Sequence, residues 1–344
     1  MVKLGNEVLR RVVFSNLGVE DKDVIVGPGI GEDAAIVRVG DKYLVMHTDP
    51  ITGAVEDVGW FAINIVANDI AVRGIKPRWF LLTLLLPGDV DEVGIARIMS
   101  DVNRALLELG GSLVGGHTEY APGIDRVIAV TTAVGVGERY VTTSGARVGD
   151  IILVTKYVAM EGTAILANDF SDLLEGRGVP KEVIERARGF TRYISVVKEA
   201  LAIADLVHAM HDATEGGLLQ GLLEVAEASG VRLRVSIDDV PILPETRTIF
   251  DALGLDPLRS LSSGMLIAAV PRSLLPIAQE RLDKVGIKYS VIGEVVKGEP
   301  AVELVRNGKV VGEVSGFIED QVMRLWQTRY GERDNKTVGT LLKK

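Results

Sequence analysis

The chain has 344 residues, which predicts about two domains, and its formal net charge is −9. An acidic chain without a run of Lys or Arg lacks the basic surface of a nucleic-acid-binding protein. It contains no cysteine, which excludes disulfides, thiolate metal sites and cysteine nucleophiles. Residues 1–6 lack the features of a signal peptide, and the longest apolar run, 79–86, is far shorter than the ~20 residues of a membrane-spanning helix. We therefore expect a soluble, cytoplasmic protein that binds neither nucleic acid nor a membrane.

The first half of the chain alternates between strand and helix patterns. The expected elements are an amphipathic helix at 4–17, strands at 24–26, 34–37 and 43–46, a helix at 57–74, a strand at 79–86, a helix at 89–109, and strands at 112–114 and 127–136. Strand 79–86 is apolar on both faces, so we expect it to be a buried central strand. This order predicts an α+β domain with a mixed sheet.

The pattern breaks at 145–150, and we place the domain boundary there, with an N-terminal domain at 1–147 and a C-terminal α/β domain at 148–344. The C-terminal elements are a strand at 151–154, helices near 164–167, 191–204 and 218–228, strands at 232–237 and 265–270, a helix at 271–285 and a strand at 289–296.

Three carboxylates of the first half occupy the ends of elements or an apolar helix. Asp33 follows a glycine-rich turn (27–31) and precedes a strand, Asp49 ends the next strand, and Asp69 lies in the apolar helix. An ionised Asp in so apolar a helix needs a cation, a metal or hydrogen-bond donors. Converging carboxylates beside glycine backbone would suit Mg²⁺ carrying nucleotide phosphates. In the competing interpretation, the glycines and Asp33 form an ordinary turn, Asp49-Pro50 is a strand exit, and Asp69 pairs with Arg73 one helical turn later.

No known glycine-rich nucleotide motif is present. The chain has no P-loop sequence, and the glycines at 27, 29 and 31 precede a strand instead of a helix, so the dinucleotide-binding fingerprint fails. Backbone N–H groups at Gly29, Gly31, Gly115 and Gly116 remain candidates for phosphate contact.

The segment 115–119 is expected to be a loop that follows strand 112–114. In it Thr118 is a candidate phosphate ligand, His117 a candidate donor and Glu119 a candidate metal ligand. A plain glycine hairpin with a solvated Glu119 explains the segment equally well.

Asp212, Thr214 and Glu215 directly precede the helix at 218–228. Capping of this helix by Asp212 or Thr214 is one interpretation, and it is compatible with phosphate or metal contact at the helix start. His208 and His211 lack a third metal ligand at suitable spacing, so we favour a structural or substrate-lining role for them. No serine nucleophile elbow is present.

Five segments in this order resemble the superfamily of aminoimidazole ribonucleotide synthetase, which includes thiamine-monophosphate kinase, selenophosphate synthetase and the hydrogenase-maturation protein HypE. The segments are 29–35 (GIGEDAA), Thr48-Asp49, 68–71 (NDIA), 115–118 (GGHT) and 212–217 (DATEGG). The resemblance covers nearly the whole chain, and 255–258 (LDPL) with 263–266 (SGML) is most similar to HypE.

The resemblance implies a two-domain PurM-like fold in which the N-terminal sheets of two subunits form a dimeric β-barrel. It implies ATP and Mg²⁺ in a cleft between the two domains, and transfer of phosphate to an oxygen or to selenium. The resemblance also implies that metal and phosphate are bound by Asp33, Asp49 and Asp69, with Thr118, Glu119 and Asp212 as further candidates.

In one respect the chain departs from HypE. HypE ends in a cysteine that carries the carbamoyl group to be dehydrated, whereas this chain ends at 338–344 (VGTLLKK) and contains no cysteine. We therefore expect a HypE-like phosphoryl-transfer enzyme that does not carbamoylate itself. The alternatives are a thiamine-monophosphate kinase and a nucleotide-binding assembly partner without turnover.

Overall fold

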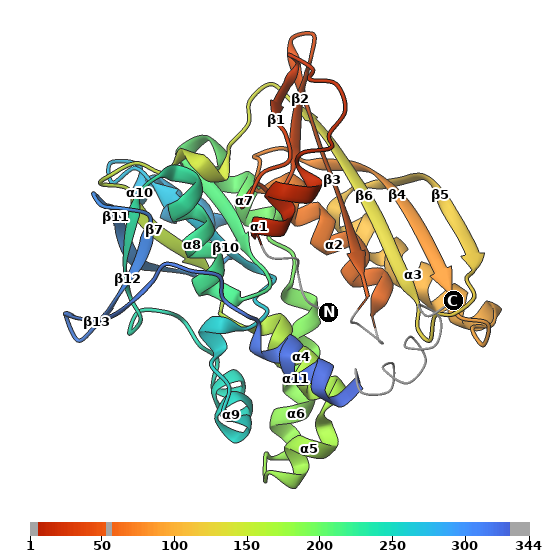
Figure 1. The fold of residues 1–344 in the computed structure, drawn as a ribbon. Coiled ribbons are helices and arrows are strands. Elements are labelled where there is room, and N and C mark those ends of the chain that lie inside the picture. Colours follow the sequence, from red (N-terminus) through yellow and green to blue (C-terminus); the bar gives the residue numbers. More distant parts are fainter. Residues whose placement is uncertain (1–5, 53–56, 331–344) are drawn as a thin grey trace.

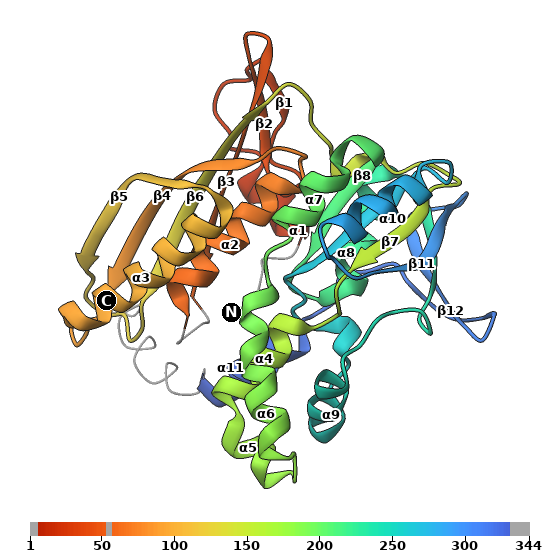
Figure 2. The ribbon, with the colours of Figure 1, turned by 180° about the vertical axis from the view of Figure 1, so that it is seen from behind.

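The computed structural model describes residues 6–52 and 57–330 (Figure 1). The expectations about residues 1–5 and about the C-terminal sequence 338–344 lie outside these residues. The described chain forms two β-sheets with helices between and around them (Figures 1 and 2). Within it, no helix combines the length and hydropathy that crossing a membrane requires.

The first sheet is mixed, as the sequence predicts, and its strand order is β1-β2-β3-β6-β4-β5. Its only parallel pair among the described strands is β4 with β5. The strands are β1 (Val24–Val26), β2 (Ala35–Val39), β3 (Lys42–Ile51), β4 (Pro77–Leu86), β5 (Ser112–Tyr120) and β6 (Ile128–Gly137). The helical segments of this half are α1 (Asn6–Val8), η1 (Leu9–Val13), α2 (Val58–Ala71) and α3 (Glu92–Leu109).

Helices α2 and α3 lie on one face of the first sheet (Figure 2). Side chains of β4 alternate across this sheet, so Phe80 and Leu82 are buried in the same core as α2, while Leu81 is 43% exposed on the opposite face. The expectation that strand 79–86 is buried on both faces is therefore wrong for a single chain. Its outward face is apolar but uncovered by the described residues.

The second sheet has the order β13-β12-β9-β11-β7-β10-β8. Its strands are β7 (Ile151–Thr155), β8 (Ala209–Ala213), β9 (Arg232–Ser236), β10 (Met265–Val270), β11 (Tyr289–Val296), β12 (Ala301–Arg306) and β13 (Lys309–Val314). The helical segments are η2 (Thr143–Gly145), α4 (Met160–Asp169), α5 (Ser171–Gly176), α6 (Lys181–Arg188), η3 (Gly189–Tyr193), α7 (Val197–Ile203), η4 (Ala204–Leu206), α8 (Gly217–Ser229), α9 (Pro244–Leu253), η5 (Pro257–Arg259), α10 (Leu275–Lys284) and α11 (Gln321–Tyr330).

Both faces of the second sheet are covered by helices, which explains why β7, β8 and β10 are buried at every residue. Leu153 points into a core shared with α2, α7 and α10, whereas Ile152 and Val154 point into a core shared with α4, α8 and α9. The first of these cores also contains β4 and α3, so the two halves share one apolar core.

Helix α2 is buried at all of its residues because it lies between the two halves (Figures 1 and 2). Asn68 donates to the Ile194 carbonyl oxygen at 2.8 Å and accepts from the Val196 backbone N–H at 2.8 Å. Trp60 Nε1 donates to the Thr191 carbonyl oxygen at 2.8 Å. These bonds attach α2 to the segment before α7 and fix the position of Asp69 relative to β8.

Candidate functional site

A cavity of about 300 Å³ lies between the two halves. The first half contributes the glycine turn before β2, the end of β3 and one side of α2. The second half contributes α4, the end of β8 with the turn that follows it, α8, the segment before β10 and α11. The site is therefore assembled from segments that are far apart in the sequence.

The predicted carboxylates of the first half, Asp33, Asp49 and Asp69, all line this cavity together with Asp212. Asp49 does not end its strand as expected, because β3 continues through Pro50 to Ile51, where Pro50 lies opposite Val130 of β6.

Gly31 also lines the cavity. Its φ is +77°, and an added Cβ would lie 3.2 Å from Glu224 Cβ, so a glycine lets this turn approach α8 closely.

Asp212 is 1% exposed, and neither of its carboxylate oxygens has a hydrogen-bond partner among the described residues. Burial, reinforced by the charge of Asp33, raises its pKa to about 7 although His211 opposes this. An unpaired buried carboxyl group costs free energy, which a bound cation would offset. The expectation that Asp212 or Thr214 caps the following helix is wrong, since Asp212 belongs to β8 and no side chain caps α8.

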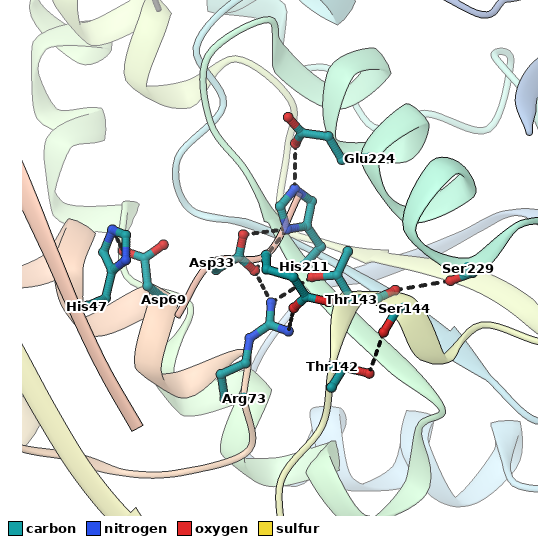
Figure 3. A network of polar contacts seen from close by, with 11 residues as sticks. Asp33, His47, Asp69, Arg73, Thr142, Thr143, Ser144, His211, Glu224 and Ser229 are labelled. Carbon is teal, nitrogen blue, oxygen red and sulfur yellow. Dashed lines mark hydrogen bonds and ion pairs between the residues drawn. The ribbon is translucent and has the colours of Figure 1, made fainter. Parts of the chain in front are cut away.

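Asp69 is also buried. Burial, with the charges of Asp212, Asp33 and Asp49 added to it, raises its pKa well above its ordinary value. His47 is its neighbour, with Nε2 3.7 Å from Asp69 Oδ2 (Figure 3). The alternative that Asp69 pairs with Arg73 is not what the structure shows, because the Arg73 guanidinium binds Glu32 and Asp33 instead.

A network of charged side chains runs through the wall of the cavity (Figure 3). Arg73 donates to Glu32 at 2.9 Å, to Thr143 Oγ1 at 2.7 Å and to Asp33. His211 lies between Asp33, 2.8 Å from its Nδ1, and Glu224, 2.8 Å from its Nε2.

These contacts set the charges of Asp33 and His211. Burial acts to raise the pKa of Asp33, but His211 and Arg73 outweigh it and lower that pKa to about 2. Burial acts to lower the pKa of His211, but Asp33 and Glu224 outweigh it and raise that pKa well above its ordinary value. His211 is therefore held as an imidazolium between two carboxylates.

The remaining predicted residues lie elsewhere. Gly115, Gly116, Thr118 and Glu119 belong to β5, the exposed edge strand of the first sheet, and do not line the cavity of their own chain. The segment is strand, not the expected loop. Gly116 has a φ of +151° and lies so close to β4 that an added Cβ would be 1.9 Å from the Leu82 carbonyl oxygen. Gly29 is not among the residues that line the cavity.

Several residues of the cavity were not among the predicted site residues, namely Glu32, His47, Glu161, Glu215 and Glu224. Glu32 adjoins Asp33, and His47 lies two residues before Asp49 on the same face of β3. Their positions beside predicted site residues could therefore have identified them. Glu161 lies just before the helix expected near 164–167 and Glu224 lies within the helix expected at 218–228, and no local pattern marks either residue as part of a site. For His211, the substrate-lining role agrees with its place in the cavity wall.

The donor set fits a hard divalent cation. Asp33, His211 and Asp212 bring ligand atoms within 4.8 Å of one another, and Asp49 and Asp69 line the same cavity. Because His211 is held by Asp33 and Glu224, the oxygens of Asp212 and Asp69 are the ligands best placed for Mg²⁺, which prefers carboxylates and water.

Comparison with known proteins identifies the family of the chain. A family model for the N-terminal domain of AIR synthase related proteins matches residues 31–137, and the model for their C-terminal domain matches residues 147–305. A putative hydrogenase expression/formation protein of Methanocaldococcus jannaschii is 29% identical over 87% of this chain and 90% of its own length. A carbamoyl dehydratase HypE of Azotobacter vinelandii is 30% identical over 78% of this chain and 79% of its own length. A thiamine-monophosphate kinase of Pyrococcus horikoshii is 27% identical over 78% of this chain and 84% of its own length.

Solved structures share the fold. A thiamine-monophosphate kinase complexed with AMPPCP and TMP has a TM-score of 0.71 at 24% identity, covering 90% of this chain and 97% of its own. HypE from a HypE–HypF complex has a TM-score of 0.70 at 19% identity (89% and 99%). HypE in complex with ATP has a TM-score of 0.66 at 21% identity (92% and 93%). The fold is therefore the two-domain PurM-like fold that the resemblance implies.

Proposed function

The chain belongs to the family of AIR synthase related proteins, and we propose that it is an ATP- and Mg²⁺-dependent enzyme that transfers a phosphoryl group to a small molecule or to a carbonyl or amide oxygen. The observation that carries the proposal is the convergence of Asp33, Asp49, Asp69 and Asp212, from both halves of the chain, on one cavity. Buried carboxylates that lie close together oppose one another's ionisation, and a bound cation relieves that repulsion.

In this proposal Asp49, Asp69 and Asp212 hold Mg²⁺, while the backbone of the glycine turn at Gly31 lies against the phosphates. When bound, Mg²⁺ neutralises phosphate charge and orients the transferred group, which is most of what phosphoryl transfer needs. Asp33 has a different task, because its charge is already matched by Arg73 and His211. It holds the glycine turn against β8 and α8.

A homodimer is part of the proposal. The outward face of the first sheet carries Leu81 as an exposed apolar side chain. The edge strand β5 is exposed along its whole length and adds the exposed Val114. Burying this face against a second copy would close the two sheets into the expected barrel. Thr118, Glu119 and the glycines of β5 do not reach the cavity of their own chain, so their proposed contact with nucleotide requires the cavity of the second subunit.

Two alternatives remain. A thiamine-monophosphate kinase is supported by a relative with that name at 27% identity. A nucleotide-binding assembly partner without turnover is supported by the similarity to a HypE that was solved in complex with HypF. The proposal does not include a carbamoylated thiol, because the 344 residues contain no cysteine.

The proposal is tested by measuring ADP formation from ATP and Mg²⁺ with panels of alcohols, amides and thiamine monophosphate as acceptors. We expect steady ADP formation that depends on one acceptor class and that Asp69→Asn reduces at least about 100-fold, with the exposed Asp41→Asn as the control. ADP formation only with thiamine monophosphate would select the kinase alternative. ATP binding without ADP formation for any acceptor would select the assembly partner.

A further inference from the structure

Part of the cavity lining lies outside the proposed metal ligands, on α4, α11, the turn after β8 and the segment before β10. We call it the acceptor end and define it by Glu161, Ile165, Glu215, Leu261, Met323 and Trp326, all of which line the cavity. Its carboxylates form a separate electrostatic group. The charges that raise the pKa of Glu161 come from Glu215 and Asp320, whereas Asp69 is affected by Asp212, Asp33 and Asp49.

Glu161 lies in the first turn of α4 and is 8% exposed. Its Oε2 accepts a long hydrogen bond of 3.3 Å from the Ser263 backbone N–H. No Lys or Arg is found among the described residues that line the cavity, and the imidazolium of His211 in its wall is already bound to Asp33 and Glu224. Ile165, Leu261 and Met323 provide apolar surface beside it.

Two cations beside the cavity are already engaged with other groups. The Arg73 side chain is fully buried and bound to Glu32, Asp33 and Thr143. Arg126 stacks over the Trp326 ring at 4.9 Å, but its Nε and Nη2 donate to Asp125 at 2.8 and 3.0 Å. An anionic group at the acceptor end would therefore be removed from water beside carboxylates without a matching cation.

We propose that the acceptor end binds a small molecule with an apolar body and a cationic or amide N–H group, and that Glu161 accepts its hydrogen bond. The inference rests on the proposed function, since it names the class of acceptor for the same cavity. Carboxylates accept strong hydrogen bonds from amidinium and amide N–H groups, and the apolar walls favour an apolar body.

Three probes of equal shape separate charge from size: benzamidine, benzamide and benzoate. Calorimetric titration of each into the full chain, with and without AMPPCP and Mg²⁺, is expected to give the affinity order benzamidine, benzamide, benzoate, with about tenfold or more between the first and last. Because burial raises the pKa of Glu161 to about 8, benzamidine binding at pH 7 should release a proton to the buffer. Titrations in two buffers of different ionisation enthalpy measure that release.

Glu161→Gln should abolish both the charge preference and the proton release, while Glu185→Gln, an exposed acid of α6, should change neither. Tight benzoate binding, an unchanged order in Glu161→Gln, or no binding of any probe would overturn the inference. Each of these results leaves the proposed function intact if AMPPCP still binds with Mg²⁺. Failure of AMPPCP binding would instead contradict the proposed function, and the titrations without nucleotide would still test the acceptor end.

Discussion

His211 Nδ1 lies 2.8 Å from Asp33 Oδ1, and this contact joins β8 of the second half to the glycine turn of the first half. The other ring nitrogen, Nε2, lies 2.8 Å from Glu224 of α8. One imidazolium thus compensates two carboxylates in the wall of the cavity. The position of the glycine turn, and with it the shape of the cavity, depends on this contact.

Replacing His211 with Gln should destabilise the protein by about 3–5 kcal/mol, because Asp33 and Glu224 then lose their shared cation in a buried position. Urea unfolding at pH 7 measures the change. The matched control is His208→Gln. The side chain of His208 is 27% exposed although its partner Asp150 is buried, so we expect this variant to lose about 1 kcal/mol of stability. Equal losses in the two variants would argue against the bridging role of His211.

Stability without divalent metal should fall as the pH rises through 7. Folding raises the pKa of Asp212 from its ordinary 3.8 to about 7, so its contribution is fully present below pH 3.8 and is lost as the pH rises through about 7. One such group changes the free energy of unfolding by at most about 1.4 kcal/mol per pH unit. The raised pKa of His211 acts in the same direction at higher pH.

Mg²⁺ should therefore raise the melting temperature more at pH 8 than at pH 5.5, because at pH 8 it meets ionised Asp212 and Asp69. Asp212→Asn should reduce this difference and also flatten the pH dependence of the metal-free protein. An Mg²⁺ effect of equal size at both pH values would show that these carboxyl groups do not bind the ion.

The outward face of the first sheet gives a prediction about assembly. Leu81→Asp should weaken self-association about tenfold or more, because it places a charge on the face that we propose to be buried in the dimer. Leu107 of α3 is 73% exposed, and Leu107→Asp should leave association unchanged. Sedimentation equilibrium distinguishes the two variants, and a wild type that remains monomeric at high concentration would refute the dimer.

Gly116 tests the close packing of β5 on β4. Gly116→Ala should destabilise the protein by about 2 kcal/mol or more, because its φ is +151° and an added Cβ would lie 1.9 Å from the Leu82 carbonyl oxygen. Gly88→Ala, where a Cβ would meet nothing within 4 Å, should be nearly neutral. Thermal unfolding of both variants decides whether β5 tolerates a side chain there.

Much of the fold follows from local patterns in the sequence. Apart from the extent of β5, the strands and helices of the first half follow hydrophobic periodicity closely, and so do β7, α8, β9, β10, α10 and β11 of the second half. Strand β8 and helix α9 were not predicted. The hairpin of β12 and β13 was not predicted, although its turn residues Asn307 and Gly308, with φ of 49° and 72°, are a known hairpin signal. Helices α5 and α6, in the polar stretch 171–185 and just beyond it, are stabilised by tertiary packing that a local pattern does not reveal.

The candidate site was only partly predictable for a different reason. The segments that carry the family resemblance contain four aspartates that all line the cavity: Asp33, Asp49, Asp69 and Asp212. Their partners come from distant parts of the chain, as the separation of 178 residues between Asp33 and His211 illustrates. For β5 the strand assignment failed because glycines at 115 and 116 suggest a turn, whereas the strand needs a glycine at 116 to pass close to β4.

The most direct test of the central claim is calorimetric titration of ATP into the wild type, with Mg²⁺ and with EDTA, alongside folded Asp69→Asn and Asp212→Asn variants. Asp41→Asn, in the exposed turn between β2 and β3, serves as the control. We predict that the wild type and the control bind ATP only with Mg²⁺, and that both cavity variants bind it at least about tenfold more weakly. Absence of binding by the folded wild type, or equal affinity in all four proteins, would contradict a nucleotide site built on these carboxylates.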